Sequence, residues 1–192
     1  MLATALSILL QFSGADDGAL GPNDRLYSFN GIPNVTFVYY DVYGTTPLEI
    51  RHYIDNRALL GRSETGRTYG AVTKPHVSWK AITQTNSKGC KITRLDIMFS
   101  VEVTLPRLAN RASVPEETLR RWDRFMEKLI SHEAGHAHNA YDHLKEIRAA
   151  IMKGGCAHGN AAGTALVLRD QQRDHEYEVT TDNGHLQGAD FP

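Results

Sequence analysis

The residues of this sequence best suited to chemistry are two histidines and a glutamate that lie within five positions. His132, Glu133 and His136 form the pattern His-Glu-x-x-His. On a helix, residues four apart lie about 40° apart around the axis and roughly 6 Å along it, so both imidazoles can bind one Zn²⁺ ion. Glu133 can then take a proton from a water on the ion as that water attacks a carbonyl. The spacing predicts zinc-dependent hydrolysis of a peptide or amide bond, with a peptide or protein as the substrate.

A long helix is predicted to carry this motif. Ser113 and Glu116 have the spacing of a capping box, and apolar residues then recur every three or four positions. Within the pattern only Gly135 interrupts before Gly154, so we predict one helix over residues 116–153. Its apolar stripe turns the motif toward the core. Metal-free buried histidines are the alternative, but burying two imidazoles and a carboxylate together is costly unless something compensates them.

The third metal ligand is not decided by the motif. An unbroken helix would place His143 about 10 Å along the axis from His136, too far to share one ion. His138 points away from the ligand face. Asp142 would need a helix break at a glycine after the second histidine, and Asn139 occupies that position. We therefore expect the ligand from the segment after Gly155, where the available residues are His158, His175, Glu176, Glu178, Asp182 and His185.

The rest of the chain predicts strands for this helix to pack on. Residues 34–43 are rich in β-branched and aromatic side chains, and a helix capped by Thr46 follows them. Residues 69–83, broken near Pro75, and 91–105, ended by Pro106, form a predicted hairpin with its turn at residues 87–89. After residue 157 we expect a short helix and then an irregular tail from about residue 180.

Composition and the N-terminus narrow the class of protein. The 192 residues are 41% hydrophobic and 22% charged with a net charge of -1, which indicates one globular domain and argues against nucleic-acid binding. The apolar run at residues 2–12 is too short for a membrane span, and small residues follow it. We predict a signal peptide over residues 1–15 and a connector over 16–33. In an exported chain, the two cysteines favour one disulfide; in a cytosolic chain they would be buried thiols.

Several short motifs occur in an order that resembles a known family. They are residues 40–46 (Tyr-Asp-Val-Tyr-Gly-Thr-Thr), 77–79, 89–90, 105–106, Trp122 ahead of the His-Glu-x-x-His motif, 177–178, and 181–189 (Thr-Asp-Asn-Gly-His-Leu-Gln-Gly-Ala). From Val35 onward the chain resembles the bacterial DUF922 family, whose members are described as predicted secreted zinc-dependent proteases. The resemblance implies an exported protein and a disulfide between Cys90 and Cys156.

The resemblance also implies roles for residues near the C-terminus. The family tail carries an aspartate where this chain has Glu178 and a histidine where it has Asn183. His185 lies two residues further on in the same glycine-flanked loop and is the expected third zinc ligand. Tyr177 either donates a hydrogen bond to the oxyanion of the reaction or packs beside the site.

Together these features predict an α+β, zincin-like domain over residues 34–192, with an antiparallel sheet packed on the long motif-bearing helix. One zinc ion would lie between the helix and the tail, and a strand within residues 93–104 could hold an extended peptide. The expected protein is a secreted or periplasmic zinc peptidase with no stable membrane insertion. The alternative is a non-enzymatic, exported, metal-stabilised binding module, which the changed tail favours. A cytosolic protein acting on DNA-bound partners is disfavoured by the neutral charge.

Overall fold

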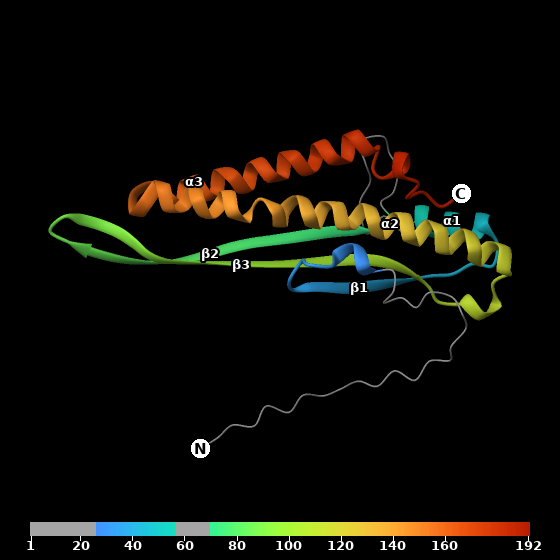
Figure 1. Ribbon diagram of the computed structural model, residues 1–192. Coiled ribbons are helices and arrows are strands. Elements are labelled where there is room, and N and C mark those ends of the chain that lie inside the picture. The colour runs from blue at the N-terminus through green and yellow to red at the C-terminus, as the bar shows by residue number, and fades with distance from the viewer. Residues whose placement is uncertain (1–25, 57–69) are drawn as a thin grey trace, which may run out of the picture.

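The structure is a computed structural model that describes residues 26–56 and 70–192. The predicted signal peptide lies outside the described residues, as does the connector up to residue 25. A helical layer lies along one face of a small, elongated sheet (Figure 1). The elements are η1 (Leu26–Phe29), β1 (Val35–Val42), α1 (Pro47–Asp55), β2 (Val72–Asn86), β3 (Gly89–Leu108), η3 (Arg111–Ser113), α2 (Glu116–Asp142), α3 (Leu144–Thr181) and η4 (His185–Gln187).

The sheet has the strand order β1-β3-β2. The predicted hairpin is confirmed, because β2 and β3 pair antiparallel across a two-residue turn at residues 87–88. β1 pairs parallel with β3, from Val35 opposite Val101 to Val42 opposite Leu108. The α+β class is therefore confirmed, whereas the expected antiparallel sheet is wrong: the sheet is mixed. A parallel pair needs a long connection, and α1 and β2 both lie between β1 and β3 along the chain.

Both prolines expected to interrupt strands lie inside them. Pro75 pairs with Val101 in the middle of β2, and Pro106 pairs with Tyr40 near the end of β3. β2 is an edge strand, so the missing N–H of Pro75 can face outward. At Pro106 the ladder to β2 has already ended, because the last pair in that ladder is Val72 with Thr104. Each proline therefore lies at a position that pairs with a neighbouring strand on one side only.

The predicted single helix over residues 116–153 is interrupted at one residue. α2 begins at Glu116 as predicted, but it has no side-chain cap, so the Ser113 capping box does not form. His143 separates α2 from α3. α3 then continues to Gly155, whose φ of 60° and ψ of -158° turn the chain back. The predicted break at the paired glycines is confirmed, and Figure 1 shows the later part of α3 returning above α2.

The returning part of α3 is longer than the short helix that we predicted. It runs from the turn at Gly155 to Thr181, so Tyr177 and Glu178 lie on a helix that reaches back along α2. The tail beyond it forms η4, and Phe191 then enters the core with only 2% of its surface exposed. Its ring contacts Trp122 and Phe125 of α2, at centroid distances of 5.8 and 5.4 Å. The C-terminal residues are thereby held against the start of α2.

The core consists of two hydrophobic clusters along the sheet. The larger one lies between α2 and the three-stranded part of the sheet and includes Val103, Leu105 and Leu129. The smaller one comprises Ile92, Leu95, Ile147 and Ile151, where α3 crosses the two-stranded hairpin. Within residues 26–56 and 70–192, no helix combines the length and the apolar character needed to cross a membrane.

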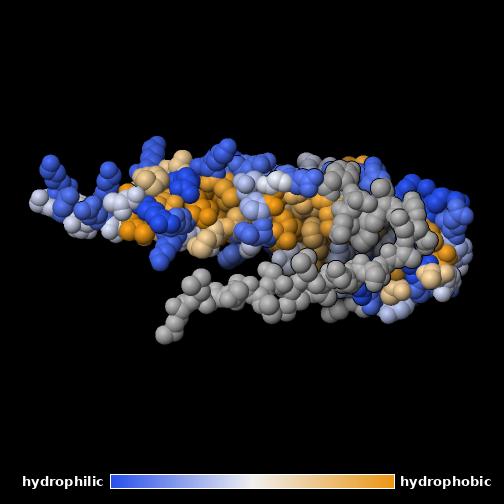
Figure 2. All heavy atoms as spheres, turned by 60° about the horizontal axis from the view of Figure 1, so that its bottom comes forward, coloured by the Kyte–Doolittle hydropathy of each residue, from blue (hydrophilic) through white to orange (hydrophobic). Residues whose placement is uncertain are grey.

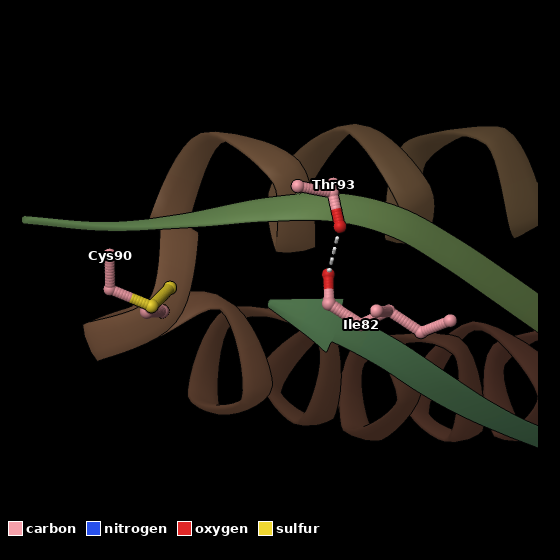
Figure 3. Close-up of a disulfide and its surroundings, with 4 residues drawn as sticks. Ile82, Cys90 and Thr93 are labelled. Carbon is pink, nitrogen blue, oxygen red and sulfur yellow. Dashed lines mark hydrogen bonds between the residues drawn. A yellow bond between two sulfur atoms is a disulfide. The ribbon is translucent and has the colours of Figure 1, made fainter. Parts of the chain in front are cut away.

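A disulfide closes the far end of the molecule. Cys90, at the start of β3, is bonded to Cys156, just after the turn at Gly155, with a Cα–Cα distance of 6.0 Å (Figure 3). The hydroxyl of Thr93 donates to the carbonyl oxygen of Ile82 at 3.0 Å across the hairpin, beside the β-bulge. The expected pairing of the two cysteines is confirmed, and it ties the hairpin tip to the point where α3 reverses.

Replacing both cysteines with serine should lower the free energy of unfolding by about 2–4 kcal/mol, because the bond closes a loop of 66 residues in the unfolded chain. Urea denaturation of the double variant and of the wild-type protein, with and without reductant, measures the difference. Thiol titration of the unreduced, denatured wild-type protein should find essentially no free thiol. Equal unfolding curves for the two proteins, or two free thiols per chain, would contradict the assignment.

Candidate metal centre

Two histidines and a glutamate meet between α2 and the returning part of α3. The Nε2 atoms of His132 and His136 lie 3.2 Å apart, and each lies 3.4 Å from a carboxylate oxygen of Glu178. All three ligand atoms fall within 4.8 Å of one another. Both histidines are buried, as the apolar stripe of the helix predicted. The three side chains form a compact donor set of two nitrogens and one carboxylate.

Both imidazoles are oriented by partners at their other ring nitrogen. Nδ1 of His136 donates to a carboxylate oxygen of Asp174 at 2.6 Å, and Nδ1 of His132 donates to the amide oxygen of Gln187 at 2.8 Å. A proton on Nδ1 leaves the lone pair on Nε2, which faces Glu178 in both cases. Metal-binding histidines are commonly held by such hydrogen bonds. These two hydrogen bonds therefore leave both Nε2 atoms free to bind a metal ion.

The donor set fits a divalent metal ion. With metal–ligand distances of about 2.0–2.1 Å, tetrahedral zinc holds its ligand atoms about 3.3 Å apart. The two Nε2 atoms lie 3.2 Å apart, and each lies 3.4 Å from a different oxygen of Glu178, so the three side chains are close enough to share one ion. Oε2 of Glu178 is buried and has no hydrogen-bond partner among the residues that the structure describes. A buried carboxylate oxygen without a partner is costly unless a cation compensates it. His132, His136 and Glu178 could thus hold a metal ion.

Glu133 lies next to this donor set but faces β2. The hydroxyl of Thr73, on β2, donates to Oε2 of Glu133 at 2.7 Å. Burial raises the pKa of the Glu133 carboxyl, and the charge of His136 and the hydrogen bond from Thr73 oppose that rise. A carboxyl whose pKa is raised toward neutrality is suited to accept and return a proton. Glu133 therefore lies beside the candidate metal ligands, with its carboxylate held by Thr73.

The surroundings of the two histidines carry an excess of negative charge. Glu133, Asp174 and Glu178 all lie near His136. Burial lowers the pKa of His136, but the hydrogen bond and charge of Asp174, together with the charges of the two glutamates, outweigh burial and raise it. A proton and a metal ion compete for the same nitrogen, since a metal-bound imidazole must be neutral. The carboxylates therefore favour positive charge at His136, whether a proton or a metal ion supplies it.

Tyr177 packs directly on the histidines, and Gly135 makes room for it. The Tyr177 ring stacks on His132 at a centroid distance of 5.1 Å and meets His136 edge-on at 5.0 Å. Its hydroxyl lies 3.3 Å from the amide oxygen of Gln187. A Cβ at Gly135 would lie 2.2 Å from the Tyr177 hydroxyl oxygen. The glycine inside the motif is therefore the residue that lets α3 approach α2.

The C-terminal loop reaches the site, but His185 turns away from it. Gly184, with a φ of 80°, packs so closely that a Cβ there would lie 3.0 Å from Cγ of His132. His185 is 44% exposed and its Nδ1 lies 3.1 Å from Asp190. The structure thus places Glu178, and not the expected His185, beside the two histidines. The reason is that the helix predicted to be short continues through Thr181, and Glu178 lies on its last turns, facing α2.

The other ligand candidates do not join the donor set. His143 contacts the carbonyl oxygen of Asn139 and lies 3.5 Å from Asp170. His138 contacts the carbonyl oxygen of Ser28, as its position on the helix predicted. The remaining candidates are also outside the cluster of three: Asp142, His158, His175, Glu176 and Asp182.

Three residues of the site were missed from the sequence: Thr73, Asp174 and Gln187. Asp174 and Glu178 are four positions apart, the same spacing as the two histidines, and on a helix this places both carboxylates on one face. That signal was available, but the short helix predicted there obscured it. Thr73 carried no such signal, because only the packing of β2 against α2 brings it to Glu133.

Comparisons with known proteins identify a family for this chain. A family model described as "Bacterial protein of unknown function (DUF922)" matches residues 37–185, which is more than half of the chain and includes the three clustered residues. No curated protein and no solved structure matches the chain.

Replacing Gly135 with alanine should lower the free energy of unfolding by about 1–3 kcal/mol, because the new methyl group would overlap Tyr177. In a Tyr177→Ala background the same replacement should stabilise the protein by about 0.5–1 kcal/mol, since alanine is the better helix former. Chemical denaturation of the four proteins gives both values. The same effect in both backgrounds would contradict the close approach of the two helices.

Proposed function

Because the chain belongs to the DUF922 family of bacterial proteins of unknown function, its activity has to be argued from its own site, and we propose that it is an exported zinc-dependent peptidase. The observation that carries the proposal is the cluster of His132, His136 and Glu178, whose ligand atoms all lie within 4.8 Å of one another, with the Glu133 carboxylate next to it. Two nitrogens and one carboxylate leave a fourth position open, as in catalytic zinc sites.

The proposed roles follow from the contacts of each residue. His132, His136 and Glu178 would hold the ion, with Asp174 and Gln187 orienting the imidazoles. Zinc bound there would lower the pKa of a bound water to near neutrality and polarise the substrate carbonyl. Glu133 takes the proton of the attacking water and delivers it to the leaving amine. Thr73 holds the Glu133 carboxylate in place through its hydroxyl.

Glu178 replaces His185 as the proposed third ligand. A set of two histidines and one glutamate is an established choice for catalytic zinc. Glu178 stands where the family tail carries an aspartate, so that change keeps a carboxylate at the position. We retain two roles for Tyr177: its ring fixes the plane of His132, and its hydroxyl can donate to the oxygen that gains charge during the attack.

Export and the zincin-like architecture belong to the same proposal. The Cys90–Cys156 disulfide supports an oxidising compartment, in agreement with the signal peptide predicted for residues 1–15. The motif-bearing helix α2 lies over the sheet, and the edge strand β2 supplies Thr73 to the site. This arrangement of helix, edge strand and metal ligands supports assigning a zincin-like peptidase domain to residues 34–192.

A metal-stabilised binding module is the second candidate function. It is favoured by the burial of the site, since His132, Glu133 and His136 are only 4%, 3% and 5% exposed. Structural metal sites are closed, whereas catalytic sites must admit water and substrate. Metal content and hydrolysis measured on the same variants separate the two functions.

Purified protein should contain about one zinc ion per chain, measured by mass spectrometry of the metal. Glu178→Ala should weaken zinc binding at least tenfold, because it removes one of three protein ligands. His185→Ala is the matched control and should keep its zinc, since His185 faces Asp190. If His185→Ala loses the metal and Glu178→Ala keeps it, the ligand assignment is wrong.

Glu133→Gln should keep its zinc and lose hydrolysis of a quenched fluorescent peptide library by about 10²–10⁴-fold, because the amide cannot take the proton. Wild-type protein and Glu133→Gln are compared at equal zinc content. Loss of zinc in Glu133→Gln would contradict its role as a base. Zinc-loaded wild-type protein that cleaves no member of the library would favour the binding module.

A further inference from the structure

The sheet has an uncovered edge on the side of β3 that faces away from β2. β1 begins at Val35, opposite Val101, so within the described part of the chain residues 89–100 of β3 pair with β2 alone. At one end of this stretch the side-chain amide of Asn34 donates to the carbonyl oxygen of Phe99 at 2.9 Å. Earlier in the same stretch, Arg148 donates to the carbonyl oxygen of Leu95 at 2.8 Å. Ile97 lies between them, and strand alternation directs its backbone N–H and C=O to the same edge.

A groove of about 430 Å³ runs along this edge. Its apolar lining includes Ile97, Phe99, Tyr141 and Leu144, where α2 gives way to α3. Figure 2 shows a band of hydrophobic surface along the elongated molecule, over the part of the hairpin that β1 does not reach. Apolar side chains and an available strand edge are the two features by which proteins bind an extended peptide as an added strand.

The charge of the groove has one sign. Among the described residues, Lys145 and Arg148 are the charged residues that line it, and both are exposed. Lys145 forms no ion pair within the part of the chain that the structure describes. Arg148 uses one N–H on the carbonyl of Leu95, which leaves further guanidinium donors for a carboxylate. The groove is therefore complementary to negative charge.

We propose that this groove binds an extended, acidic polypeptide segment, which adds as a strand to β3 along residues 95–99 and places its carboxylates on Lys145 and Arg148. The sequence predicted a peptide-binding strand within residues 93–104, but residues 101–104 are paired on both sides. Only the earlier part of that range has an open edge. The groove faces away from β2, which carries Thr73 to the metal centre, so the proposal does not depend on peptidase activity.

The test uses a fluorescein-labelled ten-residue peptide of alternating valine and glutamate. It is titrated with the full chain carrying Glu133→Gln, so that the probe is not cleaved, and binding is followed by fluorescence anisotropy. Lys145→Glu should weaken binding at least tenfold. Lys153→Glu is the matched control: this exposed lysine of α3 does not line the groove, and its replacement should change the dissociation constant less than twofold.

Two further probes test the backbone and the charge. Methylating alternate backbone nitrogens of the peptide should abolish binding, because an added strand needs those donors. A valine–lysine peptide should not bind. Unchanged affinity of the methylated peptide or of Lys145→Glu would overturn the proposal, as would equal binding of the lysine peptide.

Sedimentation shows whether a second copy of the chain occupies the edge of β3. A dimer that Lys145→Glu dissociates would also overturn the proposal. Binding that persists after zinc is removed separates this surface from the metal centre.

Discussion

The contact between α2 and the returning part of α3 is the interaction on which the site depends. α2 alone presents two imidazoles and a glutamate; the carboxylates of Asp174 and Glu178 arrive only because the chain reverses at Gly155. The approach is close enough that the motif position facing Tyr177 must be glycine. Gly135 and Tyr177, far apart in the sequence, are thereby coupled by sterics, and helix packing places the candidate metal ligands.

The same contact creates an electrostatic demand. It brings together three carboxylates and two imidazoles in a region where His132, Glu133 and His136 are almost fully buried. Hydrogen bonds from Thr73 and to Asp174 and Gln187 satisfy part of this polar cluster. Within the described residues, Oε2 of Glu178 has no hydrogen-bond partner, and a cation between the three clustered side chains would satisfy it. Packing and charge therefore point to the same position for a metal ion.

The mismatch in strand length shapes the other end of the molecule. β2 and β3 extend past β1, so this part of the sheet has two strands and relies on α3 and on the disulfide for support. A two-stranded sheet is marginal by itself, which explains the small second core and the covalent tie to the helix reversal. The extension also leaves the edge of β3 open beside two cations. The extension of the hairpin past β1 thus accounts both for the disulfide-supported second core and for the proposed binding groove.

Local sequence determined the elements whose causes are local. The histidine spacing, the apolar period of α2, the Thr46 capping box and the Gly155 break all follow from residues within a few positions of one another, and each is present. Tertiary structure decided the rest. Pro75 and Pro106 fit inside strands because each has a neighbouring strand on one side only at its position. β1 pairs parallel with β3 because α1 and β2 lie between the two strands along the chain. Glu178, and not His185, lies beside the two histidines because the later part of α3 returns across α2. Such choices depend on contacts between segments far apart in sequence, which periodicity and spacing do not encode.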